Sequence, residues 1–205
     1  MSGGNGHGDV KQPESFAFTP EYLEKAKVFI ARYPAGRQKS ALMPLLDLAQ
    51  RQEGWVSLPA MNYIAEMLDI PPMQAYEVAT FYTMYRLKPM GRHHIEVCTT
   101  TPCQLRGSDG ILATCKKVLG IGVGETTADG QFSLVEAECL AACVNAPMIQ
   151  IGDDYYEDLD EASMTKIIET LRAGGTPTPG PQNGRITSAP LGGPTTLKDI
   201  PGKEG

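Results

Sequence analysis

The sequence predicts a fold of mixed α+β and α/β class, in which an N-terminal four-helix bundle precedes a small domain of strands and helices. Three observations predict it. Apolar residues recur at helical spacing from Thr19 to about Leu87, the pattern changes to short strands after Gly91, and two close pairs of cysteines follow predicted strands. We therefore expect four segments: a disordered N-terminus over residues 1–15, the bundle over 16–90, the second domain over 91–173 and a Gly/Pro-rich extension over 174–205.

Each helix of the predicted bundle begins or ends at a recognisable signal. Thr19 is expected to cap the first helix, because Pro20 and Glu21 follow in its first turn. We expect Ser40 to cap the second helix, which ends at Gly54. The third helix opens at Ser57 and the fourth at the Pro-Pro pair of residues 71–72. The residues of the fourth helix region that we expect to face the interior are Ala75, Val78, Ala79, Tyr82 and Tyr85.

The second domain is predicted to run in the order strand, helix, strand, hairpin, helix. The expected strands cover residues 94–98, 132–137, 148–151 and 155–156, and the helices cover 108–119, with Ser108 as cap, and 161–171. This order is typical of a small α/β sandwich, which places its chemistry in loops at strand ends.

Composition excludes several classes of function. The 205 residues carry a net charge of −6, which disfavours binding to nucleic acid or to an anionic membrane surface. No apolar stretch approaches the ~18–20 residues of a membrane span. The N-terminus lacks a hydrophobic signal core and has no arginine before Arg32, so we expect no signal or transit peptide. The odd cysteine count, with four cysteines in close pairs, favours a reducing compartment.

The cysteine pairs are the strongest functional signal. Four residues separate Cys98 from Cys103, three separate Cys139 from Cys143, and thirty-five lie between the pairs. Two short thiolate loops of this kind can each hold one iron of a [2Fe–2S] cluster. The neighbouring residues suit such a site, because threonines 99–101 offer hydroxyl and N–H donors to sulfur and the small alanines 141–142 permit close backbone approach.

Other uses of these cysteines remain alternatives. A structural zinc ion also takes four thiolates, although usually from C-x2-C or C-x4-C pairs in small modules. Structural disulfides fit the expected compartment poorly, and the C-x-x-C motif of a redox dithiol is absent. Cys115 lies alone on an apolar helix face and is predicted to be a core residue. For His93 and His94, a solvated or strand-edge position is favoured over metal ligation.

The motifs together resemble one family over nearly the whole chain. They are CTTTPCQLRG and CLAACVNAPMIQIGDDYYEDL around the cysteines, EGWVSLPAMNYIAEMLDI over residues 53–70 and EVATFYTMY over residues 77–85. These segments resemble the thioredoxin-fold [2Fe–2S] subunit, the NuoE type, of NADH:quinone oxidoreductase, respiratory complex I. The tail PTPGPQNGRITSAPLGGPTTL is similar to the extension of alphaproteobacterial and mitochondrial members.

The resemblance implies a thioredoxin-like [2Fe–2S] ferredoxin domain after the bundle. It implies that Cys98 and Cys103 bind one iron of the cluster and that Cys139 and Cys143 bind the other. It also implies docking on the flavin- and NADH-binding subunit, which itself binds FMN and NADH, beside a neighbouring iron–sulfur subunit. We expect an electron-transfer subunit of a translocating oxidoreductase, without catalysis by the isolated chain.

The resemblance further implies a location at the cytoplasmic face of the bacterial inner membrane, or at the matrix side in a mitochondrion, through the assembled complex only. Two alternatives remain: the equivalent diaphorase subunit of an NAD-dependent hydrogenase or formate dehydrogenase, and a zinc-stabilised interaction module.

The extension over residues 174–205 allows two interpretations. Gly and Pro make up 14 of its 32 residues, so it cannot offset its own ordering entropy by burial. It nevertheless contains the spaced apolar residues Ile186, Leu191, Leu197 and Ile200. The segment is therefore either a plain flexible tail or one that orders along a partner subunit.

Overall fold

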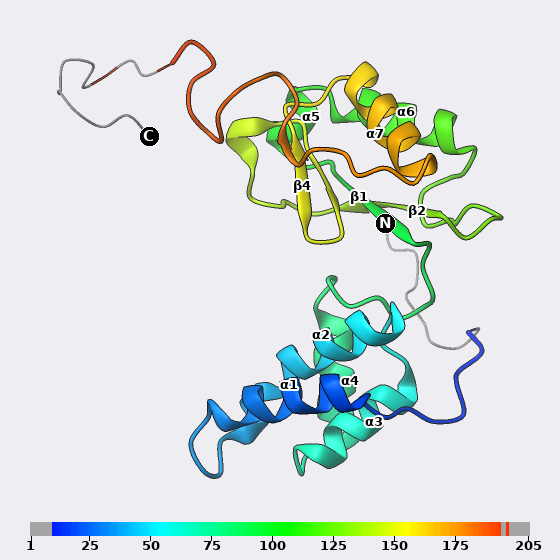
Figure 1. Cartoon of the computed structure of the whole chain (residues 1–205), viewed down its shortest axis with the longest axis vertical. Coiled ribbons are helices and arrows are strands. Elements are labelled where there is room, and N and C mark those ends of the chain that lie inside the picture. Colours follow the sequence, from blue (N-terminus) through cyan, green and yellow to red (C-terminus); the bar gives the residue numbers. More distant parts are fainter. Residues whose placement is uncertain (1–9, 194–195, 197–205) are drawn as a thin grey trace. The chain divides into compact units, whose positions relative to one another are not determined.

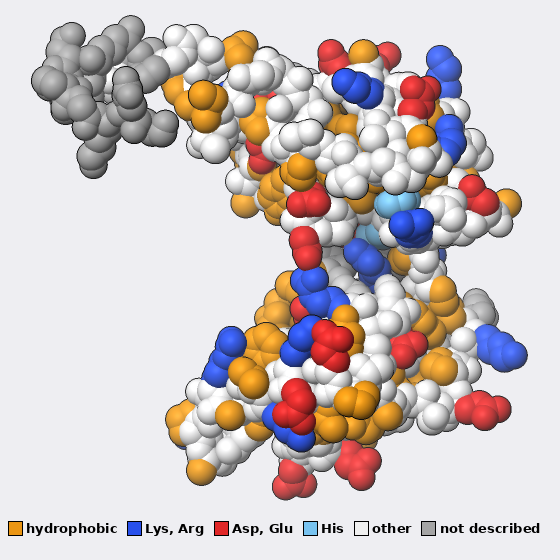
Figure 2. All heavy atoms as spheres, in the orientation of Figure 1, with side chains coloured by type: hydrophobic (Ala, Val, Ile, Leu, Met, Phe, Trp, Pro, Cys, Tyr) orange, Lys and Arg blue, Asp and Glu red, His pale blue; other side chains and the backbone are white. Residues whose placement is uncertain are grey.

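The structure of the protein is a computed structural model, and the residues described are 10–193 and 196. The chain divides after Met90 into two compact units, which are shown in Figure 1 and described separately below. The predicted disorder of residues 1–9 and the predicted anchors Leu197 and Ile200 lie outside the described residues. Charged side chains of both signs are mixed over the visible surface of each unit (Figure 2).

Over its described residues, 10–90, the N-terminal unit is built from four α-helices and one short 3-10 helix. Their bounds are α1 Pro20–Ala31, η2 Gln38–Ala41, α2 Leu42–Glu53, α3 Leu58–Met67 and α4 Pro72–Phe81. Helix α1 packs on α2, α2 on α3, and α3 on α4. The fully buried side chains at their centre include Leu45, Leu46, Met61 and Ile64. Burying these apolar faces supplies most of the stability of such short helices.

Several predicted helix ends are confirmed. The Thr19 hydroxyl accepts a hydrogen bond from the Tyr22 N–H, and the Ser57 hydroxyl accepts one from the Ala60 N–H. Gly54 ends α2 in the left-handed conformation, with a φ of 82°. Outside the helices, Gln12 Oε1 accepts a hydrogen bond of 2.9 Å from the Leu58 N–H, so this part of the N-terminal segment contacts the unit.

The predicted cap at Ser40 is wrong. Ser40 lies inside η2, and α2 starts at Leu42 without a side-chain cap. The reason is Pro44: a helix capped by Ser40 would need a hydrogen bond from the N–H of residue 44, which proline lacks. Starting at Leu42 places Pro44 in the first turn, where no donor is required.

The prediction that Tyr82 faces the interior is also wrong, whereas Tyr85 is buried as expected. Helix α4 ends at Phe81, and the backbone of Tyr82 is extended, which leaves that side chain 39% exposed. Tyr85 instead donates a hydrogen bond of 2.9 Å from its hydroxyl to the Met43 carbonyl. The helical spacing could not show that the chain leaves the helix at this point.

The C-terminal unit contains a five-stranded mixed sheet in the order β2-β1-β3-β4-β5. The strands are β1 His93–Cys98, β2 Phe132–Ala137, β3 Ile149–Ile151, β4 Asp154–Glu157 and β5 Gly180–Pro181. Strands β1 and β2 are parallel, β1 and β3 antiparallel, β3 and β4 form a hairpin, and β4 and β5 are parallel. Helices α6 Ser108–Leu119 and α7 Glu161–Arg172 pack against one another beside the sheet (Figure 1).

Some elements of this unit were not predicted from the sequence, and two predictions about its residues need correction. The short helix α5 Thr101–Leu105 and the strand β5 were not predicted. Gly107, with a φ of 100°, precedes α6, so Ser108 is its first residue rather than its cap. His94 is neither solvated nor at an edge, because β1 lies inside the sheet and the side chain is 6% exposed. Cys115 is fully buried in the core, as predicted.

Gly91 lies directly against the backbone of β2. Its N–H donates a hydrogen bond of 2.6 Å to the Ser133 hydroxyl. A Cβ atom at this position would lie 2.6 Å from the carbonyl carbon of Phe132 and 2.8 Å from its amide nitrogen. Only glycine therefore allows this close approach between the start of the unit and β2.

We predict that Gly91→Ala lowers the free energy of unfolding of the C-terminal unit by about 1–3 kcal/mol, because two backbone segments must separate to admit the methyl group. The matched control is Gly192→Ala, where no atom lies within 4 Å of the added Cβ. Urea unfolding followed by circular dichroism checks this. Equal midpoints for the two variants would contradict it.

Candidate metal centre

The register of the two parallel strands brings the cysteine pairs together. Cys98 is the last residue of β1 and pairs with Ala137, the last residue of β2. Cys103 follows Cys98 in α5, and Cys139 follows Ala137 by two residues. Because the carboxyl ends of neighbouring parallel strands lie at one edge of the sheet, both loops leave the sheet at the same place. The second loop then enters the 3-10 helix η3 Cys143–Asn145.

Contacts between the loops confirm that they converge. The backbone N–H of Leu140, from the second loop, donates to the sulfur of Cys98, from the first. The Thr100 hydroxyl lies 3.3 Å from the Cys98 sulfur and also contacts Cys139. In the second loop the sulfurs of Cys139 and Cys143 are 3.6 Å apart. All four predicted cysteines therefore lie in one region, as two pairs.

The conformation of Ala141 completes the second loop. Its φ is 65°, a left-handed conformation that is uncommon outside glycine. This turns the Ala141 N–H toward the Cys139 sulfur, at 3.4 Å. The sequence predicted only that a small residue would allow close approach here, and the structure adds a directed N–H donor.

In each pair, the pKa of one thiol is lowered from its ordinary value and the pKa of the other is raised. Burial raises the pKa of Cys98, but hydrogen bonds from the Thr100 hydroxyl and the Leu140 N–H outweigh it, and the net pKa is lowered. Burial and the neighbouring Cys98 raise the pKa of Cys103 to about 12.

The second pair repeats this arrangement. The Ala141 N–H and the Cys143 thiol lower the pKa of Cys139, whereas the hydrogen bond to Cys139 raises that of Cys143. Each pair thus combines one thiol whose pKa is lowered with one thiol whose pKa is raised. Since a metal binds the thiolate, metal binding releases the thiol protons that the pairs still carry.

The two pairs differ in exposure. Cys98 and Cys103 are buried in a small apolar cluster with Ala146 and Met148, and the Met148 N–H donates to the Cys103 sulfur. Cys139 and Cys143 are exposed. Any group bound by all four sulfurs would therefore be fixed by the core on one side and open to the surface on the other.

The donor set fits a [2Fe–2S] cluster, in which two sulfides bridge the irons and each iron takes two protein sulfurs. Two thiol pairs are what this arrangement requires, and N–H and hydroxyl donors already point at the sulfurs. Within residues 10–193, no three His, Cys, Asp or Glu side chains are grouped so that they could hold a single metal ion.

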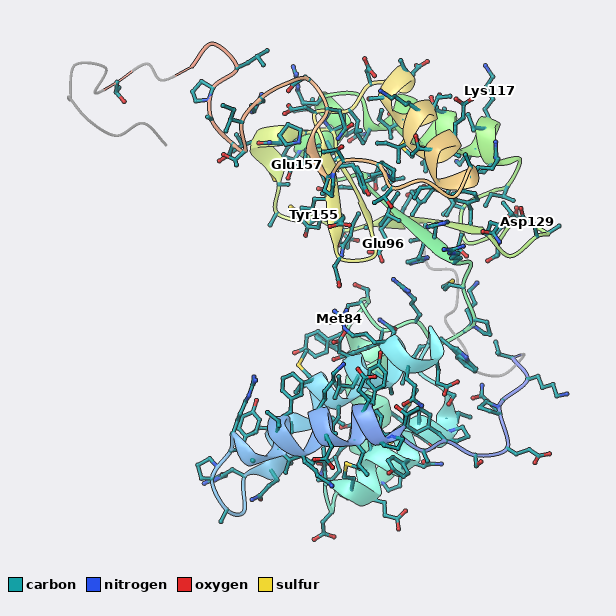
Figure 3. The ribbon with its side chains drawn as sticks, in the orientation of Figure 1. Met84, Glu96, Lys117, Asp129, Tyr155 and Glu157 are labelled. Carbon is teal, nitrogen blue, oxygen red and sulfur yellow. The ribbon has the colours of Figure 1, made fainter. Side chains whose placement is uncertain are left out.

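Some residues near the cysteines were not found from the sequence. The N–H donors of Leu140 and Met148 depend on strand register, which no local motif reveals. Tyr155 of β4, assigned from the sequence only to a hairpin, lies close enough for Glu96, Cys139 and Cys98 to affect it. Burial and these neighbouring charges raise the pKa of Tyr155 (Figure 3 labels Tyr155 and Glu96).

Comparisons with known proteins agree with this geometry. Residues 26–172 match the family described as thioredoxin-like [2Fe-2S] ferredoxin. The chain is 58% identical over 159 residues to the E-type subunit of NADH-quinone oxidoreductase from Rickettsia bellii (strain RML369-C), covering 77% of this chain and 95% of that protein. It is 58% identical over 156 residues to the same subunit from Rickettsia prowazekii (strain Madrid E), covering 76% and 88%.

A solved structure shares the fold. The NAD+-reducing [NiFe]-hydrogenase in the air-oxidized state superposes on 63% of this chain and 23% of the hydrogenase chain, with a TM-score of 0.56 and 21% sequence identity. At this identity the likeness concerns the fold alone, and it agrees with the predicted small α/β sandwich.

We predict that Cys115 resists alkylation in the folded chain while Cys139 reacts. Burial raises the pKa of Cys115 to about 12, so about one thiol in ten thousand is ionised at pH 8. Because unfolding returns this pKa to its lower ordinary value, the unfolded chain loses the proton first, and stability falls as pH rises through the ordinary thiol range.

Maleimide labelling of the cluster-free chain, mapped by mass spectrometry with and without urea, measures this. Labelling of Cys115 in the folded chain as fast as that of Cys139 would contradict the prediction.

Proposed function

The chain belongs to the thioredoxin-like [2Fe–2S] ferredoxin family and is of the same type as the E-type subunits of NADH-quinone oxidoreductase, and from this premise we propose that it is the cluster-carrying electron-transfer subunit of that oxidoreductase. The observation that carries the proposal is the convergence of two thiol pairs at the carboxyl ends of paired parallel strands. In this proposal a four-helix bundle over residues 16–90 precedes a cluster-binding domain over 91–173.

We assign Cys98 and Cys103 to one iron and Cys139 and Cys143 to the other. When bound, the cluster supplies one-electron transfer. The protein holds the four sulfurs in place and directs the N–H groups of Leu140, Ala141 and Met148 toward them. Such hydrogen bonds stabilise added negative charge on sulfur, so they contribute to setting the reduction potential.

The proposed partner is the flavin- and NADH-binding subunit, which would hold FMN and NADH, with the iron–sulfur subunit as a neighbour. The exposed pair, Cys139 and Cys143, faces outward and is the side that a partner can approach. Two large apolar side chains are exposed beside the cysteines: Leu105, two residues after Cys103, is 82% exposed, and Val144, next to Cys143, is 66% exposed. We assign Leu105 and Val144 to the surface that meets the flavin-binding partner.

No helix among the described residues is long and apolar enough to cross a bilayer. We propose a peripheral position at the cytoplasmic face of the inner membrane, reached through the assembled complex. The equivalent diaphorase subunit of an NAD-dependent hydrogenase is the alternative, because its fold is shared. The 58% identity over 95% of the Rickettsia bellii protein favours the first assignment.

We predict that Cys143→Ala abolishes the EPR signal of the reduced protein and lowers its iron content from about two per chain to near zero, since one iron loses a protein ligand. Cys115→Ala is the matched control, because this buried thiol contacts neither pair and its loss leaves the signal unchanged. A signal retained in Cys143→Ala would remove this residue from the ligand set. A colourless, iron-free wild-type protein containing zinc would refute the proposal.

We predict that Leu105→Glu weakens binding to the flavin-binding partner about tenfold or more, because burying one leucine contributes about 1.5–3 kcal/mol. The control is Val123→Glu, at an exposed apolar residue of the same unit in the loop after α6, between the two cysteine pairs in the chain but next to neither. Binding is measured by titration with the purified partner, and both variants should keep the wild-type EPR signal. Equal affinities would place the interface elsewhere.

A further inference from the structure

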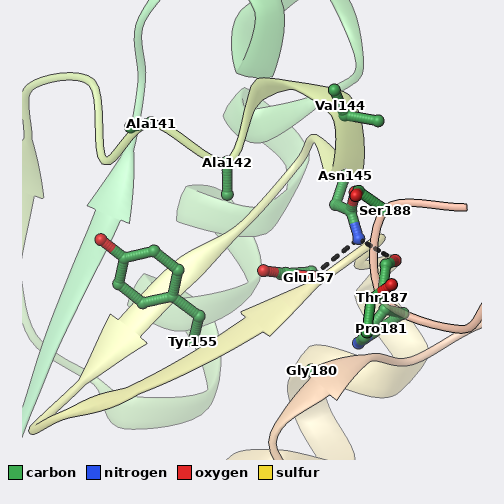
Figure 4. A pocket seen from close by; sticks show the side chains of 10 residues that line it. All are labelled: Ala141, Ala142, Val144, Asn145, Tyr155, Glu157, Gly180, Pro181, Thr187 and Ser188. Carbon is green, nitrogen blue, oxygen red and sulfur yellow. Dashed lines mark hydrogen bonds between the residues drawn. The ribbon is translucent and has the colours of Figure 1, made fainter.

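The first part of the Gly/Pro-rich extension folds back onto the loop that carries Cys143. We call residues 180–188 the strap. Its strand β5 pairs in parallel with β4, with Tyr156 opposite Gly180 and Glu157 opposite Pro181. The Gln182 N–H extends this pairing with a hydrogen bond of 2.9 Å to the Glu157 carbonyl. The strap is thereby placed beside the turn that begins at Cys143 (Figure 4).

Arg185 reaches from the strap to this turn. Its Nη1 donates a hydrogen bond of 3.0 Å to the carbonyl of Val144, the residue after Cys143. Its Nε lies 3.2 Å from Asp158 Oδ2, and the two side chains are 15% and 4% exposed. The contact between Arg185 Nε and Asp158 Oδ2 is an ion pair without a hydrogen bond, because neither atom has a hydrogen-bond partner in the described part of the chain. The ion pair thus holds the strap to the segment that follows β4, and the Asp158 N–H connects that segment to the turn through the Asn145 carbonyl.

Asn145 forms the other half of the connection. Its side-chain Nδ2 donates to the Thr187 carbonyl at 2.8 Å and to Glu157 Oε2 at 2.7 Å, as the dashed lines in Figure 4 show. Its own carbonyl accepts from the Asp158 N–H at 2.7 Å. The side chain is buried, so these bonds are protected from competition by water.

We propose that Arg185 is a positioning residue which, with Asn145, holds the Cys143 turn against the strap and so determines how firmly the exposed cysteine pair retains iron. The inference rests on the proposed assignment of Cys139 and Cys143 as ligands. Its physical basis is the difference between the pairs: the core fixes Cys98 and Cys103, whereas Cys143 stands on an exposed three-residue 3-10 helix. The strap supplies the restraint that burial does not.

This proposal gives the extension a function within its own chain. Ile186, between Arg185 and Thr187, is 78% exposed, so the strap is held by polar contacts and not by apolar burial. A polar attachment of this kind adds little to a hydrophobic core, and its effect should be concentrated on the turn that it contacts.

The test compares Arg185→Gln with Gln182→Ala in the full-length, cluster-loaded chain. Among the described residues, the Gln182 side chain donates to the Thr178 and Gly180 carbonyls alone, within its own segment, so it is a matched control. Release of iron to a chelator is followed at a temperature where circular dichroism shows both variants folded. We expect release about tenfold faster in Arg185→Gln and unchanged in Gln182→Ala, with a broadened EPR signal in the first variant only.

Two further variants separate positioning from general destabilisation. Arg185→Lys keeps the charge beside Asp158 but lacks the planar group that reaches both partners, so faster release is expected from a chain of nearly wild-type stability. In the double variant Asp158→Asn with Arg185→Gln, no buried charge is left unpaired, yet Val144 still loses its donor and release should stay fast.

Equal release rates in Arg185→Gln and Gln182→Ala, or wild-type release in the double variant, would overturn the inference while leaving the proposed function intact. A wild-type chain that binds no cluster would instead refute the proposed function.

Discussion

The hydrogen-bonded register between β1 and β2 is the constraint on which the candidate centre depends. It places Ile95 opposite Leu134, both fully buried, and it places Cys98 opposite Ala137. A slip of one residue would turn the apolar side chains of a strand to the opposite face. The hydrophobic core therefore selects the register, and the register in turn brings the Leu140 N–H to the Cys98 sulfur. The packing energy of the adjoining hydrophobic core is what makes the loops converge.

In both pairs one thiol has a lowered pKa and the other a raised pKa, but the causes differ between the pairs. Around Cys98 and Cys103, burial raises the pKa of both thiols, and a few directed donors lower the net pKa of Cys98 alone. Around Cys139 and Cys143, exposure removes most of that penalty, and the left-handed turn at Ala141 supplies the donor. The buried pair, held by the core, suits a centre that must be retained. The open pair, held by its turn, lets a partner approach that centre. The open pair needs support from outside its own loop.

The sequence predicted what depends on local spacing and missed what depends on distant contacts. Caps at Thr19 and Ser57, the strand over residues 132–137 and the buried Cys115 were readable, because each follows from neighbouring residues. Ser40 was misjudged although the decisive residue, Pro44, is local: its missing N–H moves the start of the helix. The Leu140 donor and the contact between Arg185 and Val144 had no local signal, since each joins residues about forty apart in the chain.

The described part of the extension shows how a segment that cannot fold alone becomes ordered. Without β5, the strand β4 would be the edge of the sheet and would leave a row of backbone groups unpaired. The extension needs no core of its own, because β4 offers a preformed template. Its prolines restrict the unfolded chain, which lowers the entropy lost on ordering. From composition alone, residues 174–205 are predicted to be uniformly flexible. Composition cannot show that β4, earlier in the chain, would leave an unpaired sheet edge to which this segment can bind. Pairing with that edge carries Arg185 to the Cys143 turn, so the requirement to cover a sheet edge also explains the placement of the proposed positioning residue.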